Sequence, residues 1–412
     1  MNREMKNSNI PWIGCIPASW TTCLIKQVMR NKSIKGYPNE TVLSLYREYG
    51  VIPKDSRTDN HNTTSEDTSN YKFVEVGDFV VNKMKAWQGS MAVSEYQGII
   101  SPAYYICRFV SNDVYKRYIH YLLRNETYKA EYMRLSSGLR VGQWDLNIED
   151  FLRIPMVLPL YTEQKAIADF LDKKCGEIDE LVALQEKIIE ELKSYKQSVI
   201  TETVCKGLNP NAPMKDSEVE CIGMVPEKWN VVLLPFVFRN LDYLREPISA
   251  EQRSRINPMY DYYGASGVID KIDYYNVDDD VLLIGEDGAN LKMRNLPLIY
   301  RATGKFWVNN HAHILKPIKD NIVYMQYMLE ALDYNTLITG SAQPKLSQDN
   351  LSKVRVCVPP LGEQQEIADY LDTKCSEIDQ LISIKQQKIV ELKEYKKSLI
   401  YEYTTGKKEV KL

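Results

Sequence analysis

The sequence predicts a mixed α/β (α+β) protein: two α/β domains separated by two long helices, which pack as an antiparallel coiled coil in a pseudo-two-fold arrangement. One helical segment occurs twice, with a shift of 200 residues (363 minus 163). Short apolar runs bounded by turn residues, which are typical of strands, fill the stretches between the copies. Each copy follows prolines and ends near a glycine, as long helices do.

The repeat is visible residue by residue. Glu163 to Asp172 matches Glu363 to Asp372, and the match extends to the Tyr-Lys pairs at 195–196 and 395–396. A shorter repeat precedes each half, at 13–20 and 222–229, with a shift of 209 (222 minus 13). A duplicated chain of this kind divides into alternating segments. The predicted boundaries are domain 1 at 1–158, helical spacer 1 at 159–207, domain 2 at 208–358 and helical spacer 2 at 359–412.

Apolar residues at alternating spacings of three and four predict a seam along one face of each helix. Gly207 and Gly406 mark the expected helix ends. Two matching seams in one chain can satisfy each other as an antiparallel pair, although ordinary amphipathic core helices remain an alternative. The residues predicted to form the seam or a partner-binding face are Leu171, Ile178, Leu181, Leu192, Leu371, Ile378, Leu381 and Leu392.

Composition limits the possible functions. The net charge of −3 and pI near 6.0 argue mildly against a simple nucleic-acid binder, but a local basic patch matters more than the total. The eight cysteines include no Cys-x-x-Cys pair, so we expect free thiols and no metal site. No apolar run is long enough for a membrane span, and the N-terminus resembles no secretory signal. We therefore expect a cytoplasmic protein that binds no membrane.

Polar and aromatic side chains gather in loops of both variable segments. For a chain that binds nucleic acid, these loops are the candidate contacts, because Arg, Lys, Asn and Gln can reach base edges, and Lys, Arg and small hydroxyls contact phosphates. Trp87 could equally be a core residue. The candidates in the first domain are Lys83, Lys85, Trp87, Gln88, Ser90, Ser137, Arg140 and Gln143. Those in the second domain are Tyr263, Ser266, Asn290, Lys292, Asn309, Asn310, Ser341, Gln343 and Lys345.

Over essentially the whole chain, these features resemble the specificity subunits of type I restriction–modification systems (the HsdS family). The stretches 159–172 and 359–372 resemble the opening motif of the family's conserved helices, with Pro360 as a departure from it. Ile178-Asp179 and Ile378-Asp379 continue the motif. The variable segments resemble known recognition-domain types at 77–84 and 86–90 in the first domain, and at 263–267, 309–313 and 343–346 in the second.

The resemblance implies a subunit that recognises DNA sequence and has no catalytic role of its own. It implies double-stranded DNA and two methyltransferase subunits as partners, with restriction and translocase subunits as further candidates. It also implies a bipartite, asymmetric target, each half recognised by one domain. No cofactor is expected on this chain, because S-adenosylmethionine belongs to the methyltransferase subunit.

Two other functions remain open at this stage. The chain could be a self-contained methyltransferase or nuclease that uses the stretch 257–260, which approximates an Asn-Pro-Pro-Tyr motif, or the acidic residues at 278–280 and 286–287. The missing Gly-rich methyl-donor loop and P-loop speak against a methyltransferase and an ATPase. His311 and His313 alternate on a predicted strand, and two histidines alone are more often structural than a metal pair. The chain could also be a scaffold that organises partners without DNA.

Overall fold

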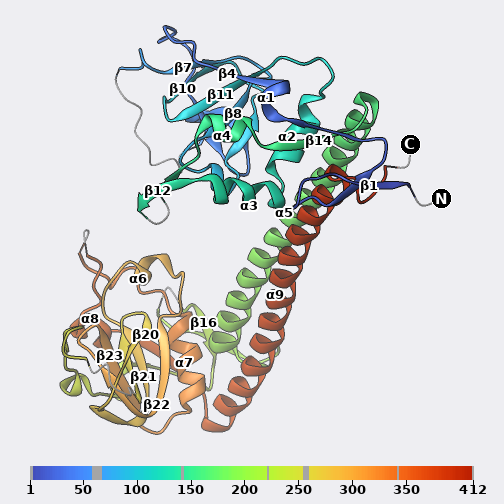
Figure 1. Cartoon of the computed structure of the whole chain (residues 1–412). Helices are drawn as coiled ribbons and strands as arrows, with labels where there is room; N and C mark the ends of the chain where they lie inside the picture. The colour runs from blue at the N-terminus through green and yellow to red at the C-terminus, as the bar shows by residue number, and fades with distance from the viewer. Residues whose placement is uncertain are drawn as a thin grey trace. The chain divides into compact units, whose positions relative to one another are not determined.

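The computed structural model describes residues 3–57, 67–140, 143–219, 222–253, 259–340 and 343–410 (Figure 1). It divides the chain into two compact units. Unit 1 comprises residues 1–186 and 387–412, and unit 2 comprises residues 187–386. Each unit therefore contains one half of each long helix, α5 (Tyr161–Lys206) and α9 (Leu361–Thr404). The four segment boundaries predicted from the sequence stay a prediction.

Within unit 1, an antiparallel four-stranded sheet with the order β4-β11-β8-β9 forms the centre of the α/β part. Strand β8 has the sequence Phe-Val-Val-Asn and is buried throughout, as expected for a central strand. The short helices α2 and α3 follow the sheet in the chain. The elements are β4 (Met29–Lys32), β8 (Phe79–Asn82), β9 (Met91–Val93), β11 (Tyr104–Phe109), α2 (Lys116–Arg124) and α3 (Glu126–Leu135).

Smaller elements surround this sheet. The described residues form five two-stranded antiparallel ladders here: β3–β14 joins stretches before and after the sheet in the chain, and the others are β1–β2, β5–β6, β7–β10 and β12–β13. Their bounds are β1 (Met5–Asn7), β2 (Cys15–Pro17), β3 (Thr21–Leu24), β5 (Leu43–Tyr46), β6 (Gly50–Pro53), β7 (Lys72–Val74), β10 (Gly98–Ile100), β12 (Ser137–Arg140), β13 (Gln143–Asp145) and β14 (Pro155–Leu158). The short helices are α1 (Ile25–Val28), η1 (Lys54–Ser56), η2 (Ala86–Gln88) and α4 (Ile148–Leu152).

Unit 2 has a larger, six-stranded sheet with the order β18-β23-β21-β22-β19-β20. Neighbouring strands are antiparallel except β19 and β22, which are parallel. The sheet differs from that of unit 1, as the unlike sequences of the variable segments predict. The strands are β18 (Phe238–Asn240), β19 (Tyr260–Gly264), β20 (Gly267–Ile272), β21 (Val277–Gly285), β22 (Ile299–Val308) and β23 (Ala312–Pro317).

Two ladders and one short helix of unit 2 correspond to elements of unit 1. The ladders β15–β16 and β17–β24 correspond to β1–β2 and β3–β14, and α8 corresponds to α4. Asn147 caps α4 and Ser347 caps α8 at positions related by the 200-residue shift. The bounds are β15 (Met214–Asp216), β16 (Met224–Pro226), β17 (Asn230–Leu233), η3 (Leu234–Phe236), η4 (Asp242–Leu244), α6 (Asn290–Met293), α7 (Ile322–Ala331), α8 (Gln348–Ser352) and β24 (Arg355–Val358).

The halves of α5 and α9 within each unit pack antiparallel (Figure 1). In unit 1, the rings of Phe170 and Tyr403 lie 4.5 Å apart, and Lys396 pairs with Asp179 at 2.6 Å. In unit 2, Lys196 pairs with Asp379 at 2.7 Å. Residue numbers fall along α9 as they rise along α5, which confirms the predicted antiparallel packing. Among the described helices, none is long and apolar enough to cross a membrane.

The buried seam differs in part from the predicted one. Ile178 and Ile378 are buried as predicted, and so are Leu171 and Leu371, while Leu192 and Leu392 are half-buried. Leu181 and Leu381 were wrongly placed there, because each is 46% exposed. The neighbouring Val182 and Ile382 are the residues turned into the seam. The pattern misled because the seam positions include Cys175 and Lys196, which do not register as apolar, whereas the adjacent heptad position is apolar.

The Glu-Gln pair at the start of each long helix makes equivalent hydrogen bonds in the two copies. The Trp20 indole donates to Glu163 at 3.1 Å, and the Trp229 indole donates to Glu363 at 3.0 Å. The buried Gln164 amide accepts from the Tyr115 backbone N–H and donates to two carbonyls. Gln364 accepts from the Asn321 N–H and donates to the Asp320 side chain and the Pro359 carbonyl. These bonds join each helix to the domain that precedes it.

Candidate nucleic-acid interface

In unit 1, the two predicted contact loops lie against each other. The Leu146 N–H donates to the Lys83 carbonyl at 3.0 Å, and the Lys83 ammonium lies 3.4 Å from Asp145. The rings of Trp87 and Trp144 meet edge to face, with centroids 5.2 Å apart. The segment 83–90 and the hairpin β12–β13 therefore form one surface, although about 50 residues of chain separate them.

The candidate side chains of the segment 83–90 differ in how exposed they are to a ligand. Lys85 is exposed, Gln88 is half-buried and Ser90 is buried. Trp87 is half-buried, and its indole N–H donates to the Met84 carbonyl at 3.1 Å. Trp87 is therefore not a core residue, and its ring is only partly free to stack on a base.

The hairpin supplies the remaining candidates of the first domain. Ser137 is exposed at the start of β12. Arg140 and Gln143 face each other in the ladder, at the ends of β12 and β13. Their side chains lie outside the described part of the structure, so their predicted role stays a prediction.

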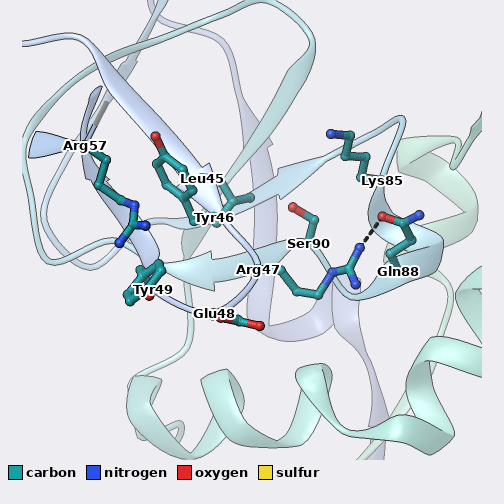
Figure 2. Close-up of a pocket in the computed structure, with 9 residues that line it drawn as sticks. All are labelled: Leu45, Tyr46, Arg47, Glu48, Tyr49, Arg57, Lys85, Gln88 and Ser90. Carbon is teal, nitrogen blue, oxygen red and sulfur yellow. Dashed lines mark hydrogen bonds between the residues drawn. The ribbon is translucent and has the colours of Figure 1, made fainter. Parts of the chain in front are cut away.

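A hollow of about 360 Å³ opens beside this surface (Figure 2). One side of the hollow is the segment 85–90, which was predicted from the sequence. The other side is the β5–β6 hairpin with Arg57, the residue that follows η1, and it was not predicted. The residues that line the hollow are Leu45, Tyr46, Arg47, Glu48, Tyr49, Arg57, Lys85, Gln88 and Ser90.

The tip of the β5–β6 hairpin is fixed from two sides. The Arg47 guanidinium donates to the Gln88 side-chain oxygen, as the dashed line in Figure 2 marks. The Arg47 carbonyl accepts from Arg124 of α2, whose other nitrogen lies 2.6 Å from His120 Nε2. Burial, reinforced by the nearby charge of Arg117, lowers the pKa of Arg124 to about 10, which leaves it charged at neutral pH. The tip is thus held in one position before any ligand binds.

In unit 2, four loops meet at one edge of the sheet. The Asn309 N–H donates to the Tyr263 carbonyl at 3.1 Å, and the Glu286 N–H donates to the His311 carbonyl at 2.8 Å. The Leu346 N–H donates to the Glu286 carbonyl at 2.7 Å. The loops at 263, 286, 309–311 and 346, which are scattered over about 80 residues of sequence, are therefore neighbours in space.

Not all of these candidates offer a free polar group. Asn290 donates to the carbonyls of residues 296 and 297, and Asn309 is buried and accepts from the His311 N–H. Tyr263 is half-buried against Phe306. Ser341 lies outside the described residues. The exposed candidates are Ser266, Lys292, Asn310, Gln343 and Lys345.

The buried carboxylate of Glu286 connects the loop at Lys345 with Arg245, the residue that follows η4. Glu286 is 7% exposed and accepts from Arg245 and, at 2.9 Å, from Lys345. Burial raises the pKa of Glu286, but the bonds from Lys345 and Arg245 outweigh it and hold the pKa below its ordinary value. Lys345 therefore has a structural partner in this state, and its charge is partly neutralised.

A family model named type I restriction modification DNA specificity domain matches the chain twice, at residues 18–194 and 226–394. These matches span most of the chain. The chain belongs to this specificity family. The two matches coincide with the two halves of the duplication, each comprising a variable α/β segment and the greater part of one long helix.

Relatives and solved structures agree with this assignment. A type I restriction enzyme specificity subunit of Methanocaldococcus jannaschii, MjaX, is 24% identical, over 97% of this chain and 96% of its own length. The S.HindORF215P specificity subunit of Haemophilus influenzae is 30% identical, but the match covers only 31% of this chain and 32% of that protein. A chain from a solved type I restriction–modification assembly superimposes with a TM-score of 0.72 at 14% identity, covering 94% of this chain and 98% of that one. That likeness supports the fold.

Specificity subunits recognise the DNA target and are not the catalytic subunits of their complexes. The acidic residues that could suggest a nuclease have partners here: Asp279 pairs with Lys316 at 2.6 Å, and Asp280 pairs with Arg301 at 2.8 Å. Within the described ranges, no group of three or more His, Cys, Asp and Glu side chains could hold a metal ion. Asn257 and Pro258 of the approximate methyltransferase motif lie outside those ranges.

The two histidines of this specificity subunit have structural partners. His313 is fully buried, with Nδ1 2.6 Å from Asp242 and Nε2 2.8 Å from the Leu346 carbonyl. His311 lies 2.7 Å from Asp287. His313 thus joins the start of η4 to the loop that precedes α8, and the predicted structural role describes both residues.

Proposed function

We propose that this chain recognises a split, asymmetric DNA sequence, with each unit contacting one half, and that it holds two methyltransferase subunits on its long helices. The observation that supports this most directly is the contrast between the units. The long helices repeat one sequence pattern at a shift of 200 residues, while the sheets have four and six strands and present different polar loops. A repeated frame with unlike recognition surfaces fits two different half-sequences.

The proposed DNA-contacting surfaces are the loop clusters described above. In unit 1 the surface comprises Lys85, Gln88 and the β12–β13 hairpin, joined by the β5–β6 side of the hollow. In unit 2 it comprises the exposed residues Ser266, Lys292, Asn310 and Gln343. Side chains of these types recognise base edges in the major groove and backbone phosphates, which requires no overall basic charge. The chain's net charge of −3 is consistent with partners that supply further positive charge.

The proposed partner surface is the exposed apolar face beside the seam. Leu181 and Leu381 are each 46% exposed, and Tyr195 and Tyr395 are 58% and 53% exposed. Exposed apolar side chains at equivalent positions of the two copies fit two equivalent binding surfaces for a partner protein. Two copies of one partner satisfy both positions, which favours two methyltransferase subunits over one. Restriction and translocase subunits would join through those partners.

The chemistry of the complex is assigned to the partner. We expect S-adenosylmethionine on the methyltransferase subunits and no cofactor on this chain. We also expect the complex to act in the cytoplasm on double-stranded DNA, without a membrane.

The test is a comparison of the chain alone with the complex that it forms with its methyltransferase. Calorimetric titration with S-adenosylmethionine should show binding to the complex and none to the isolated chain. The complex should methylate one split sequence in genomic DNA, mapped at base resolution. Methyl-donor binding by the chain alone, or methylation without sequence preference, would contradict the proposal.

A further inference from the structure

The hollow of unit 1 has an excess of positive charge. Among the described residues that line it, Arg47, Arg57 and Lys85 are cationic and Glu48 is the one carboxylate. Arg47 comes from the tip of the β5–β6 hairpin, whereas Lys85 comes from the segment beyond β8, so the cations approach from opposite sides (Figure 2). A concave surface lined by one sign of charge concentrates the opposite charge. The charge therefore favours an anion.

Two tyrosines that line the hollow, Tyr46 and Tyr49, position one of its cations. Arg57 lies over the rings of Tyr46 and Tyr49, 5.8 Å and 4.4 Å from their centroids. This stacking orients the Arg57 guanidinium.

Arg47 does not need to reorganise around a ligand. Gln88 holds the Arg47 side chain, and Arg124 holds the Arg47 carbonyl. Lys85 is exposed beside Gln88 and makes no ion pair with any described residue. Donors fixed before binding lose less entropy when the ligand arrives.

We propose that this hollow binds one backbone phosphate of the DNA that unit 1 recognises, with Arg47 and Lys85 as its main contacts. The proposal rests on the proposed function and adds a defined contact to it. A phosphate projects from the duplex and can enter a concave site, whereas base edges are recessed in a groove and need protruding side chains. Arg47 and Lys85 thus set affinity and register on the DNA rather than base preference.

The first test measures DNA binding by the complex with its methyltransferase at several salt concentrations. The variants Arg47→Ala and Lys85→Ala should each bind target and scrambled duplexes about tenfold more weakly, by the same factor for both. Each should reduce the slope of log K against log salt by about one. Glu48→Gln, which removes the opposing charge, should tighten binding to both duplexes. Lys6→Ala, a lysine outside the hollow, is the matched control and should change neither quantity.

The second test locates the phosphate. A set of target duplexes, each with one uncharged methylphosphonate, is titrated against the wild-type and Arg47→Ala complexes. At one backbone position within the first half-site, the neutral linkage should weaken wild-type binding about tenfold and leave Arg47→Ala unaffected. Thermal melting of both complexes confirms that the variant is folded.

The outcomes separate the two proposals. If wild type prefers its target but no position shows this coupling, or if Arg47→Ala changes the preferred base at one position, the phosphate site is wrong. If the wild-type complex shows no sequence preference at all, the proposed function is wrong, whatever the hollow binds.

Discussion

The Lys196 ammonium lies 2.7 Å from both carboxylate oxygens of Asp379, and the equivalent Lys396 is as close to Asp179. Lys196 and Lys396 occupy positions of the helix seam, where their stems are half-buried and their charged ends reach the partner helix. These pairs fix which residues of α5 and α9 face each other. A polar group at a seam position is a known means of setting helix register.

Reversing one charge should disturb this register. Lys196→Glu places two carboxylates together, and we expect a loss of about 1 kcal/mol, since the pair is partly exposed. The double variant Lys196→Glu with Asp379→Lys should recover most of the loss. Thermal melting followed by circular dichroism measures both. Equal melting temperatures for wild type and the single variant would show that the pair has no role in stability.

The seam itself should be sensitive to charge only at its buried positions. Replacing Ile178 and Ile378 by Asp buries two unpaired charges, at a cost of several kcal/mol, and should unfold the helix pair. The matched control replaces Leu181 and Leu381 by Asp. That control should keep its helix content and melting temperature but lose the methyltransferase partner, as measured by size-exclusion chromatography. A control variant that unfolds as readily as the first would show that our seam assignment is wrong.

The buried glutamine should matter far more than its neighbour in sequence. Gln364→Leu leaves the Asn321 N–H and the Pro359 carbonyl without partners, so we expect a loss of about 2–3 kcal/mol. Gln365→Leu removes bonds to Asn321 and Asp369 that are solvent-exposed, and it should cost less than about 1 kcal/mol. Urea unfolding of the two variants gives the comparison. Similar losses would mean that burial does not set the contribution of these amides.

The Glu286 ion pairs should depend on pH. The pKa of Glu286 is lowered in the folded state, so its ionised form contributes stability above its unfolded value, near 4.5, and this contribution disappears as pH falls through the lower folded pKa. The difference in melting temperature between wild type and Glu286→Gln should therefore be constant above pH 5 and shrink in more acidic buffer. A difference that stays constant down to pH 3 would refute the assignment.

The sequence predicted the architecture because the duplication is unusually informative. Matching helices at a fixed shift indicate a pair, and Pro and Gly mark their ends, so both helices and their antiparallel packing follow from local patterns. The seam was predicted only in part. Lys196 lies in the seam, but a search for apolar residues does not find it because it is charged. Leu181 is apolar, yet it is exposed. Apolarity alone cannot distinguish two adjacent heptad positions when one of them serves another surface.

Contact residues could be predicted where a single loop contains a polar motif. They could not be predicted where two segments far apart in the sequence form the surface together. The four loops of unit 2 were each identified from polar residues such as Asn310 and Gln343. Arg47 was missed because its contact with Gln88 joins residues 41 positions apart. The available signal was an arginine flanked by aromatic residues in the segment Tyr46-Arg47-Glu48-Tyr49. It indicates nucleic-acid contacts only once the hairpin is known to lie beside the segment 85–90.

The central claim is that each unit contacts its own half of the target. The direct measurement replaces residues 21–158 with the corresponding segment of another specificity subunit and maps methylated adenines across a genome. We expect a split target in which one half-sequence changes and the other is unchanged. A continuous target, or an exchange that alters both halves, would contradict the account.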